Sequence, residues 1–257
     1  MPTKIDTVVI FVLPILAVII SFFVKPTFFT SIFLFLALPG LYLSVRAPKY
    51  ILKSLVFSLL AGIPLMVILE YIGGASSAWA FPSSVFDFYL LGRVSTEVVL
   101  WAFFNIYTVV IFYEFMFDHH KKVSLWNRKM WALVWYLVGW SILFVFLFVF
   151  MESNIVIPYF YLSFGVIVFF LPIIIATLSY RRILPKMAYS LVYFSYLSLL
   201  YEITALNLGW WYFPGKEFVG HITLFNISFP LEELVFWIIL FAPAVISAFE
   251  YLDDDCK

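Results

Sequence analysis

The sequence predicts an all-α polytopic membrane protein, in which eight transmembrane helices form two tandem four-helix repeats. The composition, the number of long apolar stretches and the agreement of the chain with itself lead to this prediction. Of the 257 residues, 65% are hydrophobic and 12% are charged, whereas soluble domains are about 45–50% apolar and about 25% charged. So little charge cannot coat a water-soluble surface, and a net charge of zero argues against a nucleic-acid-binding protein.

Eight stretches are long and apolar enough to cross a membrane. A helix needs about 20 mostly apolar residues to span a hydrocarbon core of about 30 Å. The stretches are 6–24, 27–45, 50–72, 95–117, 130–150, 156–178, 184–205 and 231–251. The first is not expected to be a removable signal peptide, because it lacks an Ala-x-Ala-type cleavage site and a second apolar span follows at once.

The lysines and arginines predict the orientation, since cytoplasmic loops carry an excess of both. With the N-terminus in the cytoplasm, twelve of the 15 cations fall on the cytoplasmic side, and Lys25, Arg93 and Lys216 fall outside. We therefore expect a multi-pass protein of the cell membrane with both termini cytoplasmic.

The two halves of the chain match each other. At an offset of 132, and at 136 after a four-residue insertion, the matched residues are Glu70 with Glu202, Trp79 with Trp211, Phe81 with Phe213, Pro82 with Pro214, Glu97 with Glu233 and Trp101 with Trp237. This pattern predicts a duplication, with one repeat over 1–120 and a second over 121–257. Each repeat has an even number of helices, so we expect a pseudo-two-fold axis along the membrane normal and a central interface between the halves.

Each repeat has one long non-cytoplasmic connection, 73–94 or 206–230, and both carry a Trp-x-Phe-Pro motif. Such aromatic segments either form a belt at headgroup level or fold back against the protein. For the second case, the candidate substrate-binding residues are Trp79, Phe81, Trp101, Trp211, Phe213, Phe236 and Trp237.

Five glutamates share one depth in the outer third of the membrane. They are Glu70, Glu97, Glu202, Glu232 and Glu233. A charge inside a span costs roughly 2.5–3.5 kcal/mol on insertion scales and marks a functional candidate. Burial favours the neutral acid, whereas a helix N-terminus favours the anion. We expect burial to win for at least one of them, which could then act as a general acid. The alternative is a set of helix N-terminal charges at the headgroups, with Pro230 as a first-turn proline.

The remaining polar residues are weaker candidates. Glu114, Glu250 and Asp253–Asp255 are expected to be solvated charges at the inner span ends, His119 and His120 to lie on the surface, and His221 to be a weak site candidate. No nucleotide, flavin, zinc or serine-hydrolase motif occurs, and one cysteine, Cys256, makes no disulfide framework. No cofactor and no metal are therefore expected.

Carboxylic acids among aromatic rings favour carbocation chemistry on a polyene dissolved in the membrane. An acid can protonate an alkene, and aromatic faces stabilise a desolvated cation by about 2 kcal/mol or more.

The segment Glu202…Trp211-Tyr-Phe-Pro214…Pro230-Leu-Glu232-Glu233-Leu-Val-Phe236-Trp237 resembles the repeat unit of the membrane-integral, flavin-independent lycopene cyclases. The resemblance implies a lycopene β-cyclase, an isomerase of carotenoid biosynthesis that converts the linear ends of lycopene to β-rings, giving γ-carotene or β-carotene. It implies a carotenoid substrate within the bilayer and membrane lipid as the surroundings. The first half departs from the pattern, because Val94-Ser95-Thr96-Glu97 lacks the proline and the first glutamate. Glu70 and Glu202 also stand where the family usually has an aspartate. We therefore expect the second copy to carry the proton chemistry.

The resemblance implies roles for the acids. Glu232 or Glu233 would protonate the terminal alkene, and Glu202 or Glu97 would remove the proton that leaves after ring closure. Two alternatives stay open: a proton-coupled membrane carrier that uses the same carboxylates, and a carotenoid hydratase that quenches the same cation with water.

Overall fold

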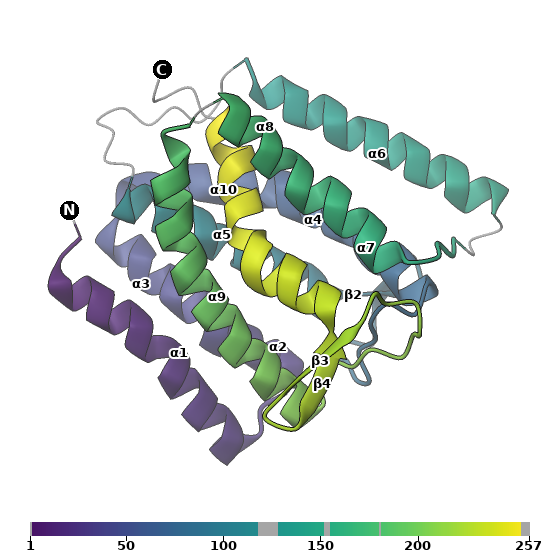
Figure 1. Ribbon diagram of the computed structural model, residues 1–257, viewed down its shortest axis with the longest axis horizontal. Coiled ribbons are helices and arrows are strands. Elements are labelled where there is room, and N and C mark those ends of the chain that lie inside the picture. The colour runs from purple at the N-terminus through teal and green to yellow at the C-terminus, as the bar shows by residue number, and fades with distance from the viewer. Residues whose placement is uncertain (1, 118–127, 152–154, 180, 253–257) are drawn as a thin grey trace.

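The computed structural model describes residues 2–117, 128–151, 155–179 and 181–252 (Figure 1). Within them, eight helices are long and apolar enough to cross a membrane, which confirms the prediction of a multi-pass membrane protein. They are α1 (Lys4–Val24), α2–η1–α3 (Phe28–Ile32, Phe33–Ala37, Leu38–Arg46), η2–α4 (Pro48–Tyr50, Ile51–Ala75), α5 (Thr96–Met116), α6 (Met130–Phe150), α7–η3–α8 (Phe160–Gly165, Val166–Phe170, Leu171–Ser179), α9 (Ile183–Leu208) and η4–α10 (Glu233–Leu240, Phe241–Leu252). Asp118, His119, His120, Lys121, Lys122, Asp253–Asp255, Cys256 and Lys257 lie outside the described residues.

The first helix begins with a capping box and is tied to the second span. The Thr3 hydroxyl accepts a hydrogen bond from the Asp6 backbone N–H, and the Asp6 carboxylate accepts one from the Thr3 backbone N–H at 2.7 Å. The Asp6 carboxylate also forms an ion pair with the guanidinium of Arg46 at 2.6 Å and accepts a hydrogen bond from the hydroxyl of Tyr42 at 2.6 Å. This buried carboxylate therefore joins the start of α1 to α3.

Three spans contain π-helical segments that the sequence did not predict. η1 and η3 end two residues before Pro39 and Pro172, and η4 ends three residues before Pro243. A proline ring clashes with the carbonyl four residues earlier in a regular α-helix. A π-helix, with its i→i+5 bonds, takes up one extra residue, so widening the preceding turn relieves this clash.

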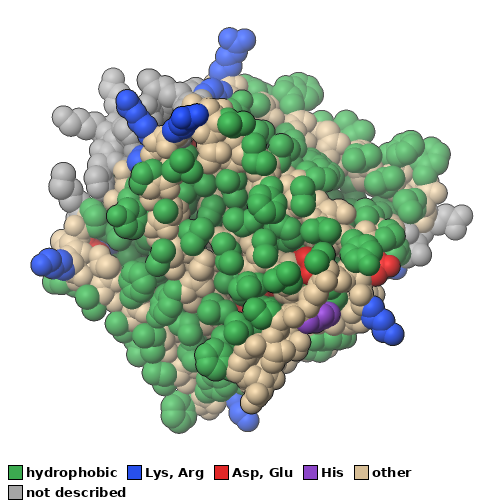
Figure 2. Space-filling view, viewed as in Figure 1, with side chains coloured by type: hydrophobic (Ala, Val, Ile, Leu, Met, Phe, Trp, Pro, Cys, Tyr) green, Lys and Arg blue, Asp and Glu red, His purple; other side chains and the backbone are tan. Residues whose placement is uncertain are grey.

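The helices differ sharply in burial. In α5, 78% of the residues in an apolar stretch of 18 residues are buried inside the protein, whereas in α6 the share is 11%. Figure 1 shows α6 along one edge of the molecule, while α4, α5 and α10 lie across its middle. Hydrophobic side chains cover most of the face shown in Figure 2, and the Lys and Arg side chains lie at its margin. This distribution fits a bundle surrounded by lipid.

Two short β-hairpins are an exception to the predicted all-α fold. β1 (Tyr89–Leu90) pairs with β2 (Val94–Ser95), and β3 (His221–Leu224) pairs with β4 (Ile227–Pro230), both antiparallel. The second hairpin turns at Phe225 and Asn226, both with positive φ, which is the backbone of a tight two-residue turn. Positive φ is uncommon for a bulky residue such as Phe225, so hydrophobic periodicity could not indicate this turn.

The two connections also meet each other. Ala80 and Tyr212 form an isolated antiparallel bridge, in which each backbone N–H donates to the carbonyl of the other at 2.9 and 3.0 Å. The loops therefore fold back and pair beside the helix ends.

Glu114 and Glu250, at the inner ends of spans 4 and 8, were expected to be solvated; this expectation is wrong for Glu114, and Glu250 is half-buried. Glu114 is fully buried and forms an ion pair with Lys53 at 2.8 Å. Glu250 accepts a hydrogen bond from the Tyr113 hydroxyl at 2.9 Å. A buried charge needs a partner, and Lys53 sits one helix away, where sequence spacing gives no sign of it.

Candidate active site

A small cavity of about 50 Å³ lies among the aromatic residues of both connections. It is lined by Phe28, Met66, Trp79, Phe81, Val98, Trp101, Tyr161, Trp211, Phe213, Glu233 and Trp237. Six of the seven aromatic residues proposed from the sequence are in this lining. The seventh, Phe236, packs against Phe169 and over Gly165, where any added Cβ would overlap its ring.

Two glutamate–tryptophan pairs support the aromatic lining of the cavity. The indole N–H of Trp79 donates to Glu70 at 2.6 Å, and that of Trp211 donates to Glu202 at 3.1 Å. Both glutamates are buried, and in both pairs the tryptophan follows the glutamate by nine residues. Each pair joins the end of a long helix, α4 or α9, to the connection after it. Gly73 makes room for the first pair, since a Cβ there would overlap the ring of Trp79.

Glu233 is the one glutamate of the five that lines the cavity. The Tyr161 hydroxyl donates a hydrogen bond to it. The carboxyl of Glu202, on α9, is buried beside it. Two buried carboxyls from different helices and a tyrosine hydroxyl therefore meet at the wall of an aromatic cavity.

Glu97 and Glu232 take a different place. Glu97 accepts hydrogen bonds from the hydroxyls of Ser84 and Ser95 and from the backbone N–H of Val85, each at 2.5 Å. Glu232 accepts one from the backbone N–H of Val219 at 2.6 Å, and its other oxygen is buried without a hydrogen-bond partner. Both carboxyls hold the connection that precedes their helix, and neither lines the cavity.

The sequence reasoning missed four lining residues: Phe28, Met66, Val98 and Tyr161. Tyr161 is the important omission because it contacts Glu233. It lies near the start of span 6 between Tyr159 and Ser163, and nothing in the sequence distinguishes its hydroxyl from theirs. His221, the weak candidate, is exposed on β3 beside Phe218 and lines neither this cavity nor the larger one.

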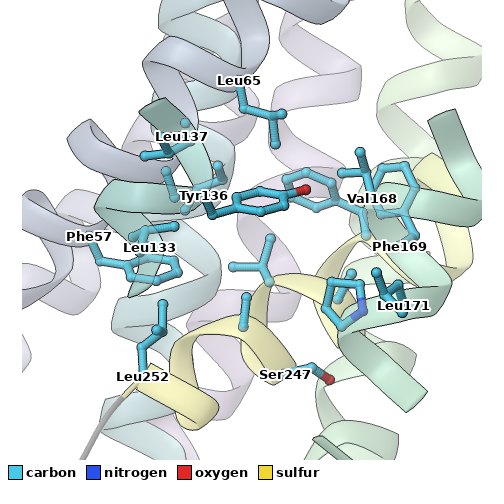
Figure 3. A pocket seen from close by; sticks show the side chains of 18 of the residues that line it. Phe57, Leu65, Leu133, Tyr136, Leu137, Val168, Phe169, Leu171, Ser247 and Leu252 are labelled. Atoms are coloured by element: carbon cyan, nitrogen blue, oxygen red, sulfur yellow. The ribbon is translucent and has the colours of Figure 1, made fainter. Parts of the chain in front are cut away.

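A second, larger cavity of about 310 Å³ lies among α4, α5, α6, η3–α8 and η4–α10 (Figure 3). Its labelled side chains are apolar except for Tyr136, whose ring projects into the space, and Ser247. Met66 and Trp237 line both cavities, so these two side chains form the partition between them.

No protein-family model, curated protein or solved structure matches the chain. Among the described residues, no three His, Cys, Asp or Glu side chains are grouped to hold a metal ion. What the site offers chemically is a carboxyl group at the cavity wall, a tyrosine hydroxyl bonded to it and the indole rings of four tryptophans.

Proposed function

We propose that the chain is a lycopene cyclase that closes the linear ends of its carotenoid substrate by acid catalysis. The observation that carries this proposal is Glu233, which lines an aromatic cavity, accepts a hydrogen bond from Tyr161 and lies beside the buried Glu202. The resemblance of the second half to the membrane-integral cyclases points the same way.

The reaction needs one proton and returns it. Glu233 protonates C2 of the terminal alkene and leaves a tertiary cation at C1. The π electrons of the C5=C6 bond then form the C1–C6 bond, which closes the six-membered ring and moves the cation to C5. Loss of the proton on C6 restores the double bond and gives a β-ring. Since C2 and C6 are both bonded to C1, the Glu202–Glu233 pair can give the first proton and take the second.

The cavity wall suits the cation intermediates. The rings of Trp101 and Trp237 pack edge to face with their centroids 5.0 Å apart, and Trp79 and Trp211 also line the cavity. Indole faces attract a cation through the ring quadrupole. An apolar lining also excludes water, which would otherwise quench the cation to a hydroxylated product.

Glu97 and Glu232 serve, in this proposal, as supports rather than as acid or base. Each binds a backbone N–H of the connection before its helix. This assignment narrows the earlier choice of acid from Glu232 or Glu233 to Glu233, and of base from Glu202 or Glu97 to Glu202.

We also propose the duplication, 1–120 and 121–257, with a pseudo-two-fold axis along the membrane normal. Matched residues should meet their own equivalents on such an axis. Ala80 pairs with Tyr212, at the offset of 132, and Trp101 contacts Trp237, at the offset of 136.

The interactions suggest a revised match at the helix start. Glu97 and Glu232 bind their connections alike, which pairs them at an offset of 135 and leaves Val98 opposite Glu233. One further residue then brings Trp101 onto Trp237, and the π-helix η4 supplies the place for it. The acid is therefore specific to the second half. With cytoplasmic termini, the cavity lies towards the outer leaflet of the cell membrane.

Expression in lycopene-accumulating cells, followed by pigment analysis, tests the function. The proposal predicts products with one or two β-rings. A hydroxylated, uncyclised pigment would instead identify a hydratase. Unchanged lycopene, in cells where the protein is present in the membrane, would contradict the proposal and leave the carrier as the alternative.

A further inference from the structure

The larger cavity opens towards the surface that lipid covers. Among its lining residues, Tyr136 on α6 is 43% exposed, and Leu171 and Ile175 on α8 are 48% and 41% exposed. All three lie within membrane-spanning helices. At these side chains the mouth of the cavity therefore faces the hydrocarbon of the bilayer.

The lining has almost no polar groups. Hydroxyls come from Tyr136, Ser247 and Tyr251, and none of the described residues that line the cavity is charged. An apolar cavity of about 150 Å³ stays dry and accepts small hydrocarbons, and this one measures about 310 Å³. A phospholipid headgroup would find no ion-pair partner in it. The chemistry selects a hydrocarbon chain without a headgroup.

The cavity is wide because small residues line it. They are Ala61, Gly62, Ala102, Ala132, Ala244 and Ala248, from α4, α5, α6 and α10. Small side chains on facing helices leave the space that a chain requires, and a single large side chain would fill much of it.

The partition between the larger cavity and the small cavity that Glu233 lines, the acid cavity, contains a side chain that can move. Met66 and Trp237 line both cavities. Methionine is unbranched and flexible and adapts to irregular neighbours. A change of the Met66 rotamer would let a chain end pass beside Trp237 towards Glu233.

We propose that the larger cavity binds the hydrocarbon chain of the substrate, which enters sideways from the bilayer between α6 and α8, with one end directed past Met66 to the acid cavity. What happens at that end rests on the proposed function, whereas the binding of the chain does not. The long axis of the chain then lies along α4 and α10.

Photo-crosslinking tests chain binding without relying on the reaction. The protein in phosphatidylcholine vesicles is irradiated with a long straight-chain alkane that carries a diazirine at its middle, and labelled peptides are mapped by mass spectrometry. We expect labels on the cavity faces of α6, α8 and α10. Ala132→Trp and Ala61→Phe, at the mouth and the inner wall, should each lower the labelling about tenfold by overfilling the space. Ile142→Trp, on the lipid-facing side of α6 and outside the cavity lining, should leave it unchanged.

The outcomes separate this inference from the proposed function. Labelling at the cavity that survives Glu233→Gln supports chain binding whether or not the parent protein makes cyclised pigment. Labelling spread over all lipid-facing helices, or equal labelling of the cavity by a phosphatidylcholine with the same diazirine, would overturn it. So would cyclisation that persists undiminished in both Ala132→Trp and Ala61→Phe.

Discussion

The two halves of the chain contribute to the acid cavity in one way that they share and in another that differs between them. On each side a buried glutamate accepts the indole N–H of the tryptophan nine residues later, Glu70 from Trp79 and Glu202 from Trp211. The second half of the chain also supplies Glu233 and Tyr161, and the Tyr161 hydroxyl donates to Glu233. The first half supplies Phe28 and Val98 to the cavity lining, and neither can carry a proton.

Both glutamate–tryptophan pairs fix an aromatic wall against the end of a long helix. Of the five glutamates, only Glu233 lines the cavity, and it comes from the second half. In the proposed reaction the pairs are therefore supports, and the added acid is the reactive part. A substrate with two reactive ends would therefore be processed one end at a time, and the first product would have one ring.

The largest expected effect comes from removing the acid of Glu233. Glu70→Gln, in the first half, is the variant to compare with it. Glu233→Gln should lower cyclised pigment by at least about 100-fold, the usual contribution of a general acid. Glu70→Gln keeps the shape of the first pair, so we expect less than about a tenfold loss, since a hydrogen bond there contributes about 1 kcal/mol. Chromatography of pigments from cells with equal protein levels measures both. Equal losses in the two variants would contradict the one-sided account.

A smaller effect is expected from the hydroxyl that accompanies the acid. Tyr161→Phe removes the hydrogen bond to Glu233, which contributes about 1.5 kcal/mol, the lower end of the range for a bond to a charged group, if the carboxylate forms during the reaction. Turnover should fall about tenfold while the substrate concentration at half-maximal rate changes little.

Tyr201→Phe is the matched control for this variant. Tyr201 is also fully inside the protein, and its hydroxyl bonds Ser31 at 2.9 Å, but it does not line the cavity. If this variant lost as much turnover as Tyr161→Phe, packing rather than proton transfer would explain both results.

The smallest effect on chemistry, and a measurable effect on stability, is expected at Glu97. In Glu97→Gln, an amide NH₂ can take the place of the oxygen that accepts the Ser84 and Ser95 hydroxyls. The buried Ser95 hydroxyl then loses its acceptor at a cost of about 1–3 kcal/mol. Thermal unfolding in detergent should occur at a lower temperature than in the parent protein. Glu232→Gln, whose carboxyl accepts one described backbone N–H, should shift it less. A loss of cyclisation at Glu97 without any loss of stability would restore Glu97 as a base.

The sequence predicts the helices well because apolar length is a strong signal. The eight helices begin and end within a few residues of the predicted spans. The self-match and the Trp-x-Phe-Pro motifs also led to six of the aromatic residues that line the acid cavity, since those residues stand out from the background of Phe, Leu and Val.

Other features depend on contacts that one sequence does not encode locally. The match of Glu97 to Glu233 assumed a regular α-helix, and the π-helix η4 changes which residues share a face. Tyr161 comes from a different helix than Glu233, and Lys53 from a different helix than Glu114. Hydrophobic periodicity describes how one helix meets lipid or protein and cannot pair polar groups between helices.

Isotope incorporation tests the central claim, that a buried carboxyl protonates the substrate, most directly. The carboxyl proton exchanges with solvent between turnovers, so cyclisation in D₂O should place a single deuterium at C2 of each β-ring, detectable by mass spectrometry and NMR of the purified pigment. Glu233→Gln should abolish both the ring and the label. Rings that form in D₂O without deuterium at C2 would contradict the account.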